Sequence, residues 1–375
     1  MKLFDVYPLF PIEPVKASGA YVYDKHGTEY LDFYGGHAVI SVGHSHPHYV
    51  KRIKDQLDNI AFYSNSVINN TQTELAEKLG KLSGYDDYQL FLCNSGAEAV
   101  ENALKMASFH NCKSKILAFE KGFHGRTMGA LRVTDGPKIK AAFNGSITTQ
   151  YLPLNELEPV EQALEDGDVA GIIIEGIQGV AGIIEPTVEF LKGLRDLADK
   201  FGVVLILDEV QSGYGRTGDF FAHQHAGIKA DVITMAKGMG NGFPIGGIIV
   251  SPAFKPSFGL LGTTFGGNHL ASAAGTAVLE VIEEENLLEN AKHQGEYLKE
   301  ELSKIDAIEA ITGRGLMLGL VIKGDGKALR SGLLTKHHIF TGGCANPNIL
   351  RLLPPMNITK KESDKLINAI KSEFS

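Results

Sequence analysis

The stretch Val203–Gln211, with the sequence VVLILDEVQ, decides the fold of this chain. Its first five residues are apolar, and such a short uninterrupted run is typical of a strand buried on both faces of a parallel sheet. Asp208 ends the run, at the strand edge where ligands of α/β proteins bind. A desolvated carboxylate needs a cationic partner, and a protonated pyridine nitrogen would serve. Taken alone, Asp208 would equally fit a metal site or a structural ion pair.

Similar apolar runs lie on both sides of this stretch and alternate with helix-like segments. Strands are predicted at Gln89–Cys93, Lys115–Glu120, Ile147–Leu152, Gly171–Glu175, Val203–Asp208, Asp231–Met235 and Gly247–Val250. Helices are predicted between them, for example at Ala97–Phe109, Leu157–Glu165 and Glu189–Phe201. This alternation predicts an α/β fold with a mostly parallel seven-stranded sheet covered on both faces.

The two ends of the chain have a different pattern. Tyr21–Gly27 alternates like a hairpin and ends in a turn signal, whereas Ala271–Glu284 is a long helix that precedes the strand-like Leu316–Ile322. We therefore expect residues 1–35 and 266–375 to form a smaller α+β domain beside a large domain of residues 36–265. A length of 375 residues fits two closely packed domains.

Composition limits the possible partners and compartment. The formal charge of −8 argues against general binding to nucleic acid or to an anionic membrane. Cys93, Cys112 and Cys344 are too few and too widely spaced for a disulfide framework, so a reducing compartment is expected. The N-terminal residues lack the long apolar core of a signal peptide, and we expect a cytoplasmic protein.

A glycine-containing turn follows the first predicted strand of the sheet. Ser95, Gly96 and Ala97 open the next helix, and backbone N–H groups at a helix N-terminus are suited to a phosphate. A simple helix cap would explain the same residues. Neither a Walker motif nor a dinucleotide-binding motif occurs here, so the sequence does not indicate a nucleotide-binding site at this turn.

Lys237 follows the strand Asp231–Met235 and stands between small residues. Small neighbours let a bulky cofactor approach, and a partly desolvated lysine has a lowered pKa that suits imine formation. An isolated lysine of this kind would more simply be a solvated surface residue. The order of phosphate turn, strand-end Asp208 and strand-end Lys237 is what favours the chemical interpretation.

With these residues in this order, the chain resembles a fold-type I pyridoxal-phosphate enzyme of the class III (ω-amino) aminotransferases. It is most similar to the acetylornithine/succinylornithine aminotransferase branch. The resemblance runs nearly end to end. The motifs that carry it are Tyr30–Phe33, Gly43–Pro47, Phe123–Thr127, Leu207–Gln211, Gly262–Asn268 and Leu350–Pro355.

The resemblance implies roles for the residues around the cofactor. Lys237 would bind pyridoxal phosphate as a Schiff base and later carry a proton, and Asp208 would hold the pyridine nitrogen protonated. Phe123 would stack on the ring and Gln211 would lie near its phenolic oxygen. The remaining cofactor-binding residues are expected to be Ser95, Gly96, Ala97 and Thr264, with Ala97 replacing the usual threonine.

The resemblance also implies the substrate site and the assembly. Arg126 would bind the carboxylate far from the reacting amine, and Arg351 would bind the α-carboxylate of glutamate, since arginine pairs with carboxylates in a bidentate way. Thr263 is expected to contribute to the substrate site. Thr264 would reach the phosphate of a neighbouring subunit, which implies a homodimer with shared active sites.

One position departs from the family pattern. Val180 stands where the family segment E-P-I-Q-G-E-G-G has its second glutamate, which pairs with the arginine matching Arg351 in ornithine-type relatives. The positive charge of Arg351 must then stay unpaired or be paired by another anion. Our hypothesis is that this chain prefers a donor with an additional carboxylate, N-succinylornithine rather than N-acetylornithine.

The expected reaction transfers the δ-amine of an N-acylated ornithine to 2-oxoglutarate, giving an N-acylglutamate semialdehyde and glutamate, as in arginine biosynthesis. Ornithine δ-aminotransferase, or another ω-amino acid aminotransferase, is the alternative. A glutamate-semialdehyde-type aminomutase fits less well, because it has no need for Arg351 in its motif. A cofactor-sensing regulator fits least, because no basic helix-turn-helix segment precedes Phe4.

His44, His46 and His48 have the spacing of a possible metal site. No cysteine or carboxylate stands beside them in the sequence, and the first two belong to the turn pattern of the family. We therefore expect a structural role and no metal.

Overall fold

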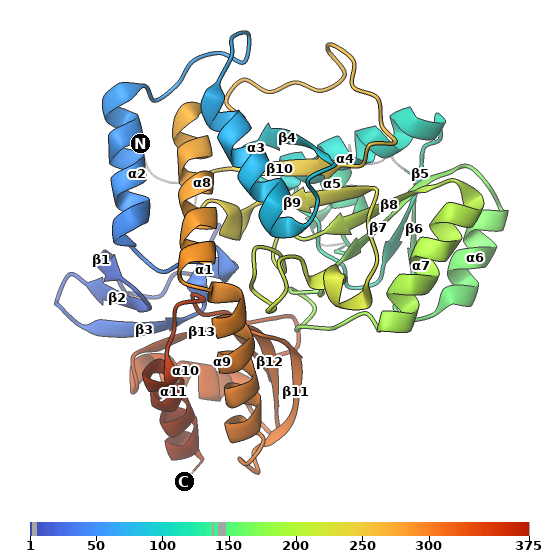
Figure 1. Cartoon of the computed structure of the whole chain (residues 1–375). Coiled ribbons are helices and arrows are strands. Elements are labelled where there is room, and N and C mark those ends of the chain that lie inside the picture. Colours follow the sequence, from blue (N-terminus) through green and yellow to red (C-terminus); the bar gives the residue numbers. More distant parts are fainter. Residues whose placement is uncertain (2–5, 137–138, 142–147, 375) are drawn as a thin grey trace.

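The computed structural model describes residues 1, 6–136, 139–141 and 148–374. Its strands form two sheets of seven strands each. One sheet comes from the middle of the chain and the other combines strands from both ends, as Figure 1 shows. The expected α/β fold class is confirmed.

The large sheet has the strand order β4-β10-β9-β8-β7-β5-β6. All of its strands run parallel except β10, which is antiparallel to both neighbours. In chain order the strands are β4 (Gln89–Cys93), β5 (Lys115–Phe119), β6 (Thr149–Leu152), β7 (Val169–Glu175), β8 (Val204–Asp208), β9 (Val232–Met235) and β10 (Gly246–Val250). These are the strands predicted from the sequence, although Ile147, the predicted start of β6, lies outside the described residues.

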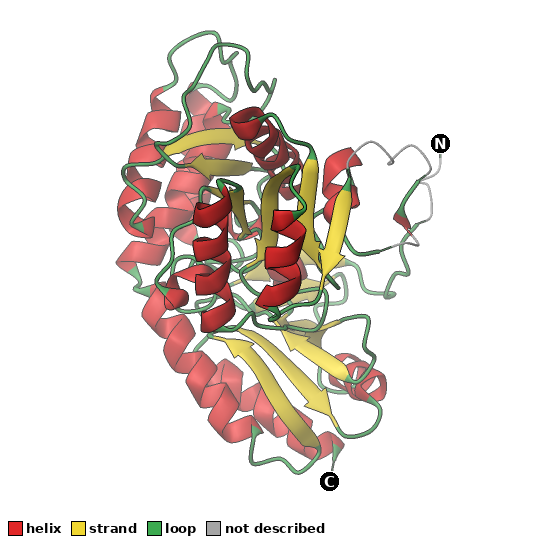
Figure 2. Ribbon diagram, turned by 90° about the vertical axis from the view of Figure 1, so that its right-hand side faces the viewer, coloured by secondary structure: helices red, strands yellow, loops and turns green. Residues whose placement is uncertain are grey.

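Helices cover both faces of this sheet because its strands are apolar on both sides. Ile206 of β8 faces the core formed with α4 (Gly96–Asn111) and α5 (Met128–Val133). Its neighbours Leu205 and Leu207 face the opposite core, with α6 (Leu157–Glu165) and α7 (Val188–Phe201). Figure 2 shows helices in front of and behind the strands. Each fully buried aliphatic side chain of this kind contributes about 1.5–3 kcal/mol.

The second sheet joins the two ends of the chain. Its order is β1-β2-β3-β13-β14-β12-β11, and the parallel pair of β3 and β13 makes the junction. The strands are β1 (Pro14–Ser18), β2 (Tyr21–Asp24), β3 (Glu29–Phe33), β11 (Ile308–Arg314), β12 (Met317–Ile322), β13 (Ile339–Gly343) and β14 (Ile349–Leu352). In the chain, α9 (Leu287–Leu302) precedes β11, α10 (Gly326–Thr335) lies between β12 and β13, and α11 (Lys360–Glu373) follows β14. The domain boundaries near residues 35 and 265 stay a prediction.

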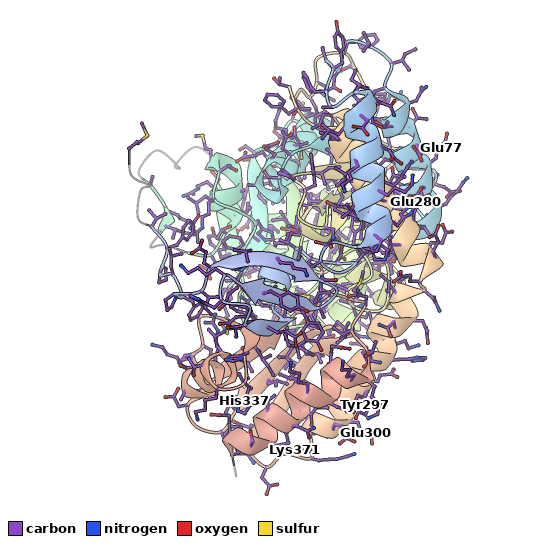
Figure 3. All side chains as sticks on the ribbon, turned by 90° about the vertical axis from the view of Figure 1, so that its left-hand side faces the viewer. Glu77, Glu280, Tyr297, Glu300, His337 and Lys371 are labelled. Atoms are coloured by element: carbon purple, nitrogen blue, oxygen red, sulfur yellow. The ribbon has the colours of Figure 1, made fainter. Side chains whose placement is uncertain are left out.

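A third group of helices lies beside the large sheet. α8 (His269–Glu284) packs against α2 (Pro47–Asn59) and α3 (Asn70–Ser83), and the short α1 (Gly35–Ala38) precedes them in the chain. Glu280 of α8, labelled in Figure 3, accepts a bond of 2.6 Å from His48 Nε2. His44 and His46 bind two other carboxylates, those of Asp32 and Glu285. The three imidazoles therefore do not converge on one point.

No helix within the described ranges is long and apolar enough to cross a membrane. Cys93, Cys112 and Cys344 form no disulfide in the described part of the chain.

Candidate active site

A cavity opens at the carboxyl ends of the parallel strands, the edge predicted from Val203–Gln211. The loops and helix starts that follow β4, β5, β7, β8 and β9 all contribute to it. Its lining residues are Gly96, Ala97, Phe123, His124, Gly125, Glu175, Val180, Asp208, Val210, Gln211 and Lys237. Most of the predicted cofactor residues therefore meet in one place.

Asp208 is held rigidly at the bottom of this cavity. Its Oδ1 accepts hydrogen bonds from Thr234 Oγ1 at 3.0 Å and from the Val210 N–H at 3.1 Å, and its Oδ2 lies 2.7 Å from His124 Nδ1. Burial opposes a charge on His124, but the bond to Asp208 prevails and raises the pKa of the imidazole. A carboxylate has about four acceptor positions, so a further donor can still bind.

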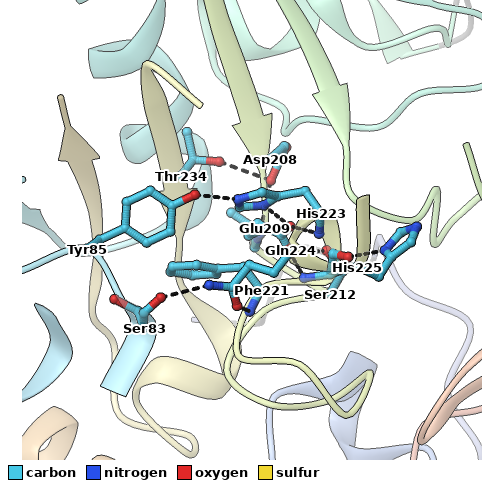
Figure 4. Close-up of polar contacts among 12 residues, drawn as sticks. Ser83, Tyr85, Asp208, Glu209, Ser212, Phe221, His223, Gln224, His225 and Thr234 are labelled. Carbon is cyan, nitrogen blue, oxygen red and sulfur yellow. Dashed lines mark hydrogen bonds and ion pairs between the residues drawn. The ribbon is translucent and has the colours of Figure 1, made fainter. Parts of the chain in front are cut away.

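The carboxylate that follows Asp208 in the sequence belongs to a separate network, shown in Figure 4. Glu209 accepts bonds from Ser212 Oγ at 2.6 Å and from His223 Nδ1 at 2.7 Å, and His223 Nε2 lies 2.7 Å from Tyr85 Oη. All of these groups are buried. The network fixes the end of β8 and so fixes the position of Asp208.

Lys237 begins a short 3₁₀ turn, Lys237–Met239, after β9. Its φ of 46° is in the left-handed region, which a residue with a side chain rarely adopts and which is found at functional sites. Burial lowers the pKa of its amine, although Asp208 and Glu175 act in the opposite direction. Its Nζ has no hydrogen-bond partner among the described residues, so the amine is available for chemistry.

Two observations show that this cavity suits a phosphorylated pyridine. The N–H groups of Gly96 and Ala97, the first residues of α4, have no partner in the described part of the chain, because Ser95 caps only the Glu98 N–H. Gln211 Oε1 is buried without a partner, while its Nε2 donates to the His37 carbonyl at 3.2 Å. The donors suit a phosphate and the amide oxygen suits a hydroxyl on a ring.

The predicted substrate arginines differ in their surroundings. Arg351 is buried on β14, where Nε donates to the Gly343 carbonyl at 2.9 Å and Nη1 donates to the Gly179 carbonyl at 3.0 Å. It therefore lies next to Val180, which lines the cavity. Arg126 is exposed and does not line the cavity. Its role stays a prediction.

Thr263 and Thr264 lie away from this cavity in the single chain. Thr263 lines a different depression with Asn65 and Gln72, and its Oγ1 accepts from the Gly266 N–H at 3.1 Å. Thr264 is exposed. The role predicted for Thr264 requires a second subunit, and the roles of both residues stay predictions.

Sequence reasoning gave no role to two residues that the structure places in the cavity. His124 binds Asp208, and Glu175 ends β7 directly beside Asp208 in the register of the sheet. His124 lies within the motif Phe123–Thr127, and Glu175 begins the family segment that contains Val180. Glu175 could have been found by the argument used for Asp208, since both are acids at the ends of buried parallel strands.

The fold and the cavity together define a pyridoxal-phosphate-dependent enzyme of fold-type I. A half-buried lysine and a fixed aspartate line the same cavity at the start of a helix, and the donors present fit this cofactor.

The comparisons with known proteins identify the family within this class. The family described as aminotransferase class-III matches residues 5–374, and the chain belongs to it. It is 39% identical to an acetylornithine aminotransferase of Bacillus cereus over 98% of this chain and 96% of that one. It is 42% identical to an acetylornithine aminotransferase of Archaeoglobus fulgidus, over 94% and 92% of the two chains.

A solved structure gives the same result for the fold. An ornithine aminotransferase of Toxoplasma gondii, described with partial occupancy of PLP at its active site, superposes with a TM-score of 0.89. The match covers 99% of this chain and 92% of the other at 28% identity. The class III aminotransferases depend on pyridoxal phosphate, as expected from the resemblance.

Proposed function

We propose that this enzyme transfers the δ-amine of N-acetylornithine to 2-oxoglutarate and forms N-acetylglutamate semialdehyde and glutamate, as a step of arginine biosynthesis. The observation that carries the proposal is that Lys237 and Asp208 line one cavity, in a chain about 40% identical over nearly its whole length to acetylornithine aminotransferases. The proposed setting is the cytoplasm, which the small number and wide spacing of the cysteines support.

The residues of the cavity would hold the cofactor at five points. Lys237 would bind it covalently, and Asp208 would pair with its ring nitrogen. The first N–H groups of α4 would hold the phosphate, with Ser95, Gly96 and Ala97 as its binding turn. Phe123 would lie against the ring, and Gln211 would face the ring hydroxyl.

When bound, pyridoxal phosphate supplies a ring that withdraws electrons and so eases removal of a proton from the carbon bearing the amine. Lys237 Nζ takes up that proton and later returns one. Its lowered pKa suits this task, because a larger fraction of the amine is neutral near pH 7. Asp208, kept in place by His124 and Thr234, holds the opposite charge that the ring nitrogen requires.

The substrates would be recognised through their carboxylates. Arg126 would bind the carboxylate distant from the reacting carbon, and Arg351 would bind the α-carboxylate of glutamate or 2-oxoglutarate beside it. Thr263 would contribute to the substrate site. Thr264 would reach the phosphate of a neighbouring subunit, so we propose a homodimer with shared sites, which sedimentation analysis would test.

A donor panel tests the proposed reaction. N-acetylornithine, N-succinylornithine, ornithine and γ-aminobutyrate are compared as donors at a fixed concentration of 2-oxoglutarate. The expected result is that kcat/KM for N-acylated ornithine exceeds that for free ornithine, and the reverse order would overturn the assignment. The preference for N-succinylornithine suggested by Val180 stays a prediction, which this panel decides.

The alternative is an ornithine δ-aminotransferase, the activity named for the Toxoplasma relative. The same panel separates the two, since they differ only in whether the donor carries an acyl group. A glutamate-semialdehyde-type aminomutase is tested by adding 2-oxoglutarate to the amine form of the cofactor. Return of the aldehyde absorbance would exclude an enzyme that does not use an external acceptor.

A further inference from the structure

Glu175 joins two parts of the active site through its carboxylate. Its Oε1 accepts from the Phe123 N–H at 2.9 Å, and its Oε2 accepts from the Gly179 N–H at 3.0 Å. The side chain is only 6% exposed, so water cannot replace either bond. In the ionised form, which prevails above about pH 7, both oxygens act as acceptors for these two N–H groups.

The backbone of Gly179 continues the connection to the second sheet, because the carbonyl of this residue lies just across its Cα from the N–H that Glu175 holds. Its carbonyl accepts from Arg351 Nη1 at 3.0 Å and also from the Gly182 N–H at 3.3 Å. A side chain at position 179 is impossible without rearrangement, because a Cβ would stand 1.7 Å from Gln211 Oε1. The backbone conformation of Gly179 thus decides where its carbonyl meets the Arg351 guanidinium.

Arg351 forms no ion pair with any carboxylate of the described residues. Two backbone carbonyls, those of Gly179 and Gly343, take its Nη1 and Nε. Nη2 has no partner within the described ranges and remains free for a substrate carboxylate. Glu175 is the carboxylate whose charge acts on both Arg351 and Lys237. Val180 contributes no charge.

We propose that Glu175 is the positioning residue for Arg351: it fixes the N–H of Gly179 and, through the backbone of this residue, the carbonyl that holds the guanidinium ready for the α-carboxylate of 2-oxoglutarate or glutamate. The inference rests on the proposed role of Arg351 and on 2-oxoglutarate as acceptor. It also answers how an arginine without a neighbouring acid keeps a defined position, because a buried acid acts on it through the backbone of one residue.

The variant Glu175→Gln tests this directly. Its amide has one acceptor oxygen and one NH₂ group, so either the Phe123 or the Gly179 N–H would face a donor. At pH 8, where the parent Glu175 is ionised, we measure the affinity of the holoenzyme for glutarate, an unreactive dicarboxylate, by calorimetry, together with KM for 2-oxoglutarate and for N-acetylornithine. Glu362→Gln is the matched control, because this carboxylate also accepts a backbone N–H, from Thr359 at 3.0 Å, but lies on α11.

The expected result for Glu175→Gln is about tenfold weaker glutarate binding and about tenfold higher KM for 2-oxoglutarate, the usual effect of losing one buried charged hydrogen bond. KM for N-acetylornithine should change at most about twofold, and Glu362→Gln should leave all three values unchanged. Equal glutarate affinity in Glu175→Gln and the parent enzyme would overturn the inference, as would equal increases in both KM values. Failure of the parent enzyme to bind glutarate would instead refute the proposed acceptor.

Discussion

Glu175 should make the stability of the protein fall with rising pH, and the effect is large enough to measure. Burial raises the pKa of Glu175 from 4.5 to about 7, with Asp208 adding to the shift, whereas His124 and the two backbone N–H groups oppose it. The folded protein therefore keeps this proton up to about pH 7, and the unfolded chain releases it near 4.5. The carboxyl thus favours folding at low pH, and this advantage is lost as the pH rises through about 7.

The pKa values give the size of this effect. At 1.36 kcal/mol per pKa unit, the change from 4.5 to about 7 corresponds to about 3 kcal/mol, most of which falls between pH 5 and pH 8. Glu175→Gln cannot ionise. Its free energy of unfolding relative to the parent protein should therefore increase by about 2–3 kcal/mol over this range.

Urea denaturation of the cofactor-free proteins at pH 5, 6, 7 and 8 measures this difference without a contribution from cofactor binding. Glu362→Gln serves as the contrasting variant. Although burial acts to raise it, hydrogen bonds from Thr359 and Tyr21 lower the pKa of Glu362, so its stabilising effect is present at higher pH and is lost on acidification. This loss falls below about pH 5, so the Glu362→Gln difference should stay constant from pH 5 to pH 8, while that of Glu175→Gln increases. A difference between Glu175→Gln and the parent that does not change with pH would refute the reasoning.

Three further substitutions test other parts of the structure. Lys237→Ala should lower kcat about 1,000-fold in a steady-state assay, because the group that moves the proton is lost; retention of more than a tenth of the rate would contradict this role. Val180→Glu, at a position 39% exposed, places an acid next to Arg351; an ion pair of about 1 kcal/mol should raise KM for 2-oxoglutarate about fivefold, and an unchanged KM would show that the new acid does not reach the guanidinium. Arg216→Met removes a buried cation that donates to three backbone carbonyls. Each unpaired carbonyl costs about 1–3 kcal/mol, partly offset by removal of the desolvated charge, so the free energy of unfolding in urea should fall by about 3 kcal/mol, and a fall below about 1 kcal/mol would contradict this account.

The large sheet could be predicted because its information is local. Val204–Asp208 is apolar at every position before the acid, and a strand buried on both faces requires such a run. The positions of Asp208 and Lys237 followed in turn, since the carboxyl ends of parallel strands meet at one edge of a sheet. No local pattern predicted that β3 pairs with β13. The sequence indicated only that the two ends of the chain pack together in one domain.

The sequence by itself therefore determined the strand-end chemistry, the cofactor class and the family, because these depend on residue types in a fixed order. Only the tertiary structure decided which groups surround that chemistry. The bond from His124 to Asp208 spans 84 positions, and that from Arg351 to the Gly179 carbonyl spans 172. Such contacts depend on how turns direct the chain and on which backbone groups remain unpaired, and no local pattern encodes either. Val180 illustrates the division: the sequence showed that Arg351 lacks the usual acid, and the fold supplied two carbonyls and the buried Glu175 in its place.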